Sequence, residues 1–153
     1  MKIYELKSEQ LLKTDIDTAW SFFSNPENLN TITPPELNFV ITSELNGKMY
    51  NGQIITYKIA VLPGIKQNWV TEIKSVEKNK MFIDEQRFGP YKFWHHKHIF
   101  MEKNNEILMT DLIHYALPLG ILGRIVHFLF VKNKLRKIFN YRFKVLEEKF
   151  NKA

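Results

Sequence analysis

Residues 91–116 read YKFWHHKHIFMEKNNEILMTDLIHYA, with two runs, 91–102 and 106–116, on either side of Asn104-Asn105. Both runs are rich in aromatic and β-branched residues, which favour strands, and paired asparagines tolerate the left-handed backbone of a tight turn. The stretch therefore predicts a β-hairpin with a two-residue loop.

The register of this hairpin brings the most informative side chains together. Opposed residues point to the same side of a sheet, and side chains two apart on a strand share that side. The pairs expected on one face are Trp94 with Tyr115, His96 with Ile113, His98 with Asp111, and Phe100 with Met109. That face would carry a large apolar surface with a His-Asp pair and a second histidine, while His95 and His114 point away from it.

Similar runs precede the hairpin. Strand patterns cover residues 37–44, 53–62, 67–77 and 80–88, separated by turn-forming Gly, Pro and Asn, and residues 2–13 resemble an edge strand. Between residues 2–13 and 37–44, Asp15 or Asp17 caps a helix that places Ile16, Ala19, Trp20 and Phe23 on one face. A second short helix spans 26–32. The short connections predict an antiparallel meander.

After Gly123 the apolar period becomes 3.6 and continues to the end of the chain. One stripe holds Phe128, Val131, Leu135, Ile138, Phe139, Phe143, Leu146 and Phe150. We expect one α+β domain over residues 1–153, with a seven-stranded curved antiparallel sheet, two short helices and a long C-terminal helix of about 28 residues. Because a straight helix cannot touch a curved sheet everywhere, we also expect a cavity between them.

Composition narrows the function classes. The chain has 153 residues and no cysteine, which excludes a disulfide scaffold and thiolate chemistry. Its net charge of +6 is carried by residues 132–153, with eight basic and two acidic side chains. Nucleic-acid binding is disfavoured because the aromatic residues lie on the apolar stripe and not among the basic positions. Without a signal-peptide pattern or a spanning segment, we expect a cytoplasmic protein.

The His-Asp face has three interpretations. His98 and Asp111 satisfy each other inside the core, or they orient an amphipathic small molecule within an apolar pocket, or His98 acts as a general base. A metal held by His96, His98 and Asp111 lacks a further ligand in the pattern, so no metal and no cofactor are expected. Weaker candidates for lining the same pocket are Tyr57, Trp69 and Gln86.

Residues 117–131 are apolar nearly all round, and glycines stand at 120 and 123. Such a segment packs on two sides or rests on something outside the molecule. One interpretation is a lid over the cavity mouth, formed by Leu119, Ile121 and Leu122. Another is contact with a membrane surface, in which Lys132, Lys134, Arg136 and Lys137 meet anionic headgroups. The third interpretation is that these basic side chains form the solvated face of the C-terminal helix.

Several segments resemble the START/SRPBCC superfamily, the helix-grip proteins that include birch-pollen-allergen-like and polyketide-cyclase-like members, and a bacterial ligand-binding branch in particular. The similar segments are 20–29 (WSFFSNPENL), 32–35 (ITPP), 84–86 (DEQ), 89–100 (GPYKFWHHKHIF), 115–118 (YALP) with Asp111, and 139–142 (FNYR).

The resemblance implies a hydrophobic cavity and the binding or transport of a lipid, a polyketide or a similar molecule. It also makes an epimerase-like protein a candidate partner and a cyclase or dehydratase an alternative activity. The identity of the ligand and the oligomeric state stay open at this level.

Overall fold

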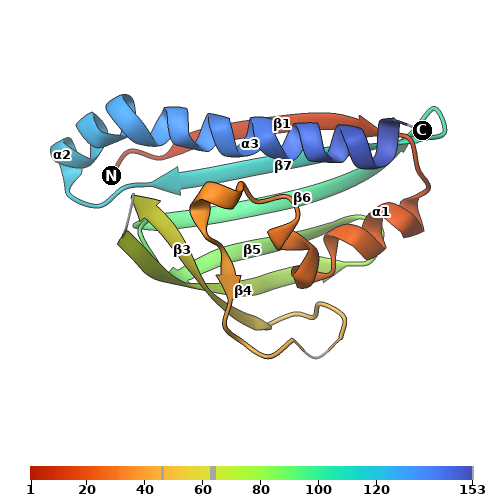
Figure 1. Cartoon of the computed structure of the whole chain (residues 1–153), viewed down its shortest axis with the longest axis horizontal. Coiled ribbons are helices and arrows are strands. Elements are labelled where there is room, and N and C mark those ends of the chain that lie inside the picture. Colours follow the sequence, from red (N-terminus) through yellow and green to blue (C-terminus); the bar gives the residue numbers. More distant parts are fainter. Residues whose placement is uncertain (46, 63–64, 153) are drawn as a thin grey trace.

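The structure, a computed structural model, describes residues 1–45, 47–62 and 65–152. One curved seven-stranded antiparallel sheet has the order β1-β7-β6-β5-β4-β3-β2, and the C-terminal helix crosses one of its faces (Figure 1). The strands are β1 (Tyr4–Leu12), β2 (Val40–Ile41), β3 (Ile54–Leu62), β4 (Ile65–Glu77), β5 (Met81–Phe88), β6 (Phe93–Lys103) and β7 (Glu106–Ala116). The predicted fold class and meander are confirmed.

The β6–β7 hairpin has the register that its sequence predicts. Trp94 pairs with Tyr115, His98 with Asp111, and the other two expected pairs also form. Asn104 and Asn105 adopt φ values of 53° and 62°, as both central residues of a type I′ turn must. The tight turn therefore fixes which side chains share the inner face.

The helices before the sheet are short. Helix α1 (Ile16–Phe23) is capped by Asp15, whose carboxylate accepts a hydrogen bond from the Thr18 amide, and it is followed by η1 (Pro26–Asn30). The strand expected over 37–44 is wrong for most of its length. Residues Pro35–Leu37 form the single turn η2, and Asn38 has a left-handed φ of 44°, so pairing is restricted to the two residues of β2.

The C-terminal helix runs through four segments, α2 (Gly120–Val126), the π turn η3 (His127–Val131), α3 (Lys132–Leu146) and the π turn η4 (Glu147–Asn151). In η3 the Lys132 amide bonds to the His127 carbonyl, five residues back, so this turn holds more residues than an α turn. The predicted apolar stripe therefore fails before Val131. His127 faces the sheet, whereas Phe128 is 76% exposed. Phe143 is also more exposed than predicted, at 42%.

The interior is filled by the chain's own side chains. Three apolar clusters occupy it, centred on Phe100 and Met109, on Tyr57 and Trp69, and on Ile113 and Tyr115. A hollow between β1, β7 and α3 has a volume of only about 10 Å³. This hollow is far smaller than the wide apolar cavity expected from curvature, because large aromatic side chains occupy the concave face.

Candidate functional site

Five ionisable side chains meet in the middle of the molecule. His96 and His98 come from β6, Asp111 from β7, Asp84 from β5 and Arg142 from α3. All but Asp84 are less than 9% exposed, and the Asp84 side chain is 17% exposed. We call this group the buried charge cluster.

Each histidine lies between the two carboxylates. His98 places Nε2 at 2.9 Å from Asp84 Oδ2 and Nδ1 at 3.0 Å from Asp111 Oδ1. His96 places Nε2 at 2.8 Å from Asp111 Oδ1 and Nδ1 at 3.5 Å from Asp84 Oδ2. The two imidazole centroids are 3.8 Å apart. His96 and His98 are two residues apart on β6, so their side chains share one face of the sheet. Each carboxylate therefore lies close to both imidazoles.

The pKa values of the two histidines are shifted in opposite directions. Burial opposes the charged form of His98, but the hydrogen bonds and negative charges of Asp111 and Asp84 outweigh it and raise the pKa of His98. Burial and the neighbouring His98 lower the pKa of His96 more than the carboxylates raise it. These directions favour His98 over His96 as the protonated ring, with a neutral His96 bonded through Nε2 to the Asp111 carboxylate.

The carboxylates stay charged despite burial. Burial raises the pKa of Asp111, but Arg142 and the two histidines hold it far below its usual range. The pKa of Asp84 is lowered by His96, His98 and Arg142 against the same opposing effect of burial. With His98 protonated, the imidazolium and the guanidinium balance the two carboxylates, which is the condition under which buried charges are tolerated.

Arg142 is the least satisfied member of the cluster. Its Nη2 lies 3.4 Å from Asp111 Oδ1, and its Nε is buried without any hydrogen-bond partner. The hollow of about 10 Å³ adjoins this side chain and is also lined by Met109, Phe139 and Phe143. A space of that size holds about one water molecule. The position therefore suits a single hydrogen-bond acceptor.

Base and metal chemistry are disfavoured by the same geometry. Both nitrogens of His98 face carboxylates, so no lone pair is directed at a substrate position. Ligand atoms of Asp84, His96 and His98 lie within 4.8 Å of one another and could hold a cation. They already bond to each other or to Asp111, and the nearby guanidinium opposes a cation.

Of the remaining predicted site residues, Met109 lines the hollow beside Arg142, and Tyr57 and Trp69 belong to a separate apolar cluster. Trp94 contacts Trp69 edge-on at 5.4 Å between centroids, and Trp69 Nε1 and the Tyr57 hydroxyl both bond to Thr71 Oγ1. Gln86 holds the β5–β6 turn through the backbone of Tyr91. In this structure these side chains contact other groups of the protein, and their part in ligand binding stays a prediction.

Sequence reasoning missed Asp84 and Arg142. Asp84 pairs directly with His96 across β5 and β6, but the connection between these strands is no two-residue turn and gave no register from which to find it. A signal did exist for Arg142. It stands in the buried row Leu135, Phe139, Arg142 and Leu146, as the one cation among apolar residues at spacings of four and three.

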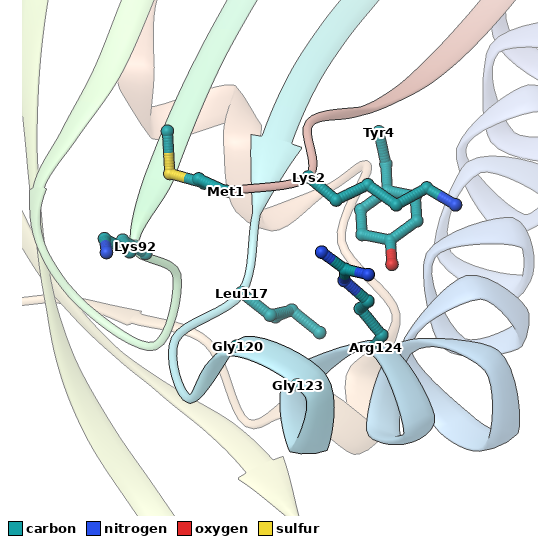
Figure 2. Close-up of a pocket in the computed structure, with 8 residues that line it drawn as sticks. All are labelled: Met1, Lys2, Tyr4, Lys92, Leu117, Gly120, Gly123 and Arg124. Atoms are coloured by element: carbon teal, nitrogen blue, oxygen red, sulfur yellow. The ribbon is translucent and has the colours of Figure 1, made fainter.

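A second hollow lies at the opposite end of the C-terminal helix, where the first residues of the chain meet α2. Its volume is about 160 Å³, and Figure 2 shows Lys2, Lys92 and Arg124 around it together with Tyr4 and Leu117. The expected lid residues Leu119, Ile121 and Leu122 are exposed to 73%, 74% and 56%. Their side chains therefore lie largely in solvent in this structure, and their action as a lid stays a prediction.

Solved structures of the same fold come from bacteria and plants. A protein from Thermus thermophilus matches with a TM-score of 0.71 and 16% identity, covering 95% of each chain. The ginseng major latex-like protein 151 matches with a TM-score of 0.66 and 14% identity over 97% of each chain. A Thalictrum norcoclaurine synthase variant, bound to a transition-state analogue, matches with a TM-score of 0.66 and 13% identity, covering 97% of this chain and 96% of that chain. At these identities the likeness shows the fold.

No family model and no curated protein matches the sequence. None of the helices among residues 1–45, 47–62 and 65–152 has the length and apolar character needed to span a bilayer.

Proposed function

From the START/SRPBCC-like helix-grip fold that this chain has, we propose that it binds an amphipathic small molecule between the sheet and α3. The molecule has an apolar body and a neutral hydrogen-bond acceptor, such as a carbonyl or hydroxyl oxygen. The observation that carries this proposal is the buried Nε of Arg142, which has no hydrogen-bond partner in a side chain that lines a hollow.

The charge balance of the cluster supports a neutral acceptor. The carboxylates, the imidazolium and the guanidinium already cancel, so an added carboxylate would leave one uncompensated charge in the interior. A carbonyl oxygen would complete the hydrogen bonds of Arg142 without that cost. The side chains of Met109, Phe139 and Phe143 line the same hollow and supply apolar contact.

Entry of such a molecule requires α3 to move away from β1. The helix is held by one buried row and by polar bonds to the edge strand: the Gln10 Nε2 donates to the Phe143 carbonyl and to Glu147 Oε2, each at 3.0 Å, and Asn151 Nδ2 donates to the Leu11 carbonyl at 2.9 Å. The bonds of Gln10, which itself lines the hollow, would have to break for opening there. Opening at this seam would enlarge the hollow while the sheet stays intact.

The test compares three probes of equal chain length: a fatty ketone, the corresponding fatty acid and the alkane, each titrated by isothermal calorimetry. We expect the ketone to bind most tightly, because only it supplies a neutral acceptor. Arg142→Lys keeps the charge and removes the Nε donor, so it should abolish the preference for the ketone. Arg136→Lys, on the exposed side of the same helix, is the matched control and should leave it unchanged. Failure of the folded protein to bind any of the three would overturn the proposal.

A further inference from the structure

The segment α2–η3 exposes an unusual amount of apolar surface. Only Gly123 and His127 of its twelve residues, 120–131, are buried. Eight apolar side chains of this region are at least 39% exposed: Leu119, Ile121, Leu122, Ile125, Val126, Phe128, Leu129 and Phe130. Contiguous apolar surface of this kind marks a place where something else binds. We call it the apolar end.

Basic side chains surround the apolar end. Residues 115–146 contain no Asp or Glu, and Arg124, Lys132, Arg136 and Lys137 are all exposed. Lys2 and Lys92 approach from the start of the chain and from the β5–β6 turn, and with Arg124 they line the hollow of about 160 Å³ (Figure 2). None of the eight described residues that line this hollow is acidic. The site therefore suits an anionic group at the border of apolar surface.

The apolar end is fixed to the sheet and not a loose tail. The His127 ring stacks on Tyr4 with centroids 3.5 Å apart, and its Nε2 forms a hydrogen bond of 2.9 Å with the Tyr115 hydroxyl. Burial, Lys132 and Lys2 lower the pKa of His127, so the ring is neutral and able to accept that bond. The exposed side chains are consequently held outward while the fold stays intact.

We propose that the apolar end docks on the surface of an anionic lipid bilayer. The exposed apolar side chains enter the interfacial region, and the phosphate of a lipid headgroup occupies the hollow lined by Lys2, Lys92 and Arg124. Charge complementarity favours this occupant over a second copy of the chain. In a two-fold dimer the same cations would face each other across the contact, with no acid of this segment to compensate them.

Vesicle flotation tests the proposal. The protein should float with vesicles of phosphatidylcholine mixed with phosphatidylserine, and much less with phosphatidylcholine alone. Binding should weaken as salt is raised, because screening reduces the attraction of exposed charges. Equal binding to both vesicle types, or no binding to either, would overturn the proposal.

Substitutions locate the contact. Phe128→Ser with Phe130→Ser should lower the vesicle partition coefficient about a hundredfold, since each phenyl ring loses apolar burial worth about a tenfold factor. The control is Met101→Ser, which changes a side chain that is 58% exposed near the β6–β7 turn and should have no effect. Both variants should keep the unfolding midpoint of the original protein, because the altered side chains are exposed.

A second pair of variants tests the contribution of the hollow. Arg124→Ala should lower partition about fivefold, as expected for one basic residue at an anionic surface. Lys48→Ala, which removes an exposed cation from the β2–β3 loop, should leave it unchanged. Inorganic phosphate that binds the protein in the absence of any vesicle affinity would show a free-phosphate site and overturn docking. Light scattering that shows a dimer dissociated by the Phe128→Ser and Phe130→Ser pair would also overturn it.

Discussion

The middle of this molecule and one of its ends reverse the usual distribution of side chains. In the middle, charged residues lie in the interior, with Asp111 3% and Arg142 6% exposed. At the apolar end, phenyl rings lie in solvent, with Phe128 76% and Phe130 64% exposed. Both regions involve the same C-terminal helix, so the contrast arises from position along one element.

The difference between the two regions separates side chains that contribute to folding from side chains that contribute to association. Members of the buried charge cluster depend on each other, so removing one should cost folding free energy. Side chains of the apolar end contribute little to folding, so removing one should alter association with something else. Four measurements test this separation.

The largest expected effect is on the cluster. Arg142→Met should lower the free energy of unfolding by about 3–5 kcal/mol, because it leaves Asp111 and Asp84 buried with less compensating charge. Chemical denaturation followed by circular dichroism measures the loss. Arg136→Met, on the exposed side of the same helix, should change it by less than about 0.5 kcal/mol. Similar losses in the two variants would remove the contrast.

The attachment of α2 to the segment that follows β7 depends on a close approach. A Cβ at Gly123 would lie 2.1 Å from the Pro118 carbonyl oxygen, so Gly123→Ala forces the backbone apart. We expect a loss of about 1–3 kcal/mol, as for other overpacked sites. Hydrogen exchange should report it first in α2. Gly120→Ala is less suitable as a control because Gly120 has a positive φ of 53°, whereas Ile125→Ala changes only an exposed side chain.

The pH dependence of stability tests the assignment of His98. Because its pKa is raised above the ordinary 6.5, its contribution is fully present below pH 6.5 and is lost as the pH rises through the folded-state value. The pKa of His96 is lowered, so its effect on the free energy of unfolding changes with pH in the opposite direction. The difference in unfolding free energy between the protein and His98→Gln isolates the first contribution. It should shrink from mildly acidic to alkaline pH, and a constant difference would contradict the imidazolium assignment.

The smallest expected effect on folding is at the apolar end. Phe128→Ser should change the free energy of unfolding by less than about 0.5 kcal/mol, since the ring is already in solvent. The same substitution should reduce binding of an environment-sensitive fluorophore measurably. A large loss of stability instead would mean that this ring packs against the protein, and the contrast between the two regions would fail.

Local patterns predicted most of the fold. The β6–β7 register followed from Asn104-Asn105 and alternation, because a two-residue turn leaves little freedom in pairing. Asp15 was one of two predicted caps and is the one used. Residues 37–44 were mispredicted because Pro35 and the left-handed Asn38 break a run whose composition suits a strand.

Non-local features were harder to predict. Asp84 joins the site through the β5–β6 pairing and Arg142 through helix docking, and neither contact is encoded in local spacing. The cavity was inferred from the shape of a curved sheet and a straight helix, which takes no account of side-chain volume. Phe82, Phe100 and Phe139 occupy the space that the backbone leaves.

The π turn at His127–Val131 has a consequence for comparing this chain with others. It accommodates one residue more than the α-helix that would join the same two faces, and it keeps His127 stacked on Tyr4. A homologous chain lacking one residue here would keep the stacking partner with an ordinary α-helix. An alignment of the two chains would therefore show a single-residue gap at the π turn. The exposed phenylalanines beside the turn should be compared only after that gap has been placed.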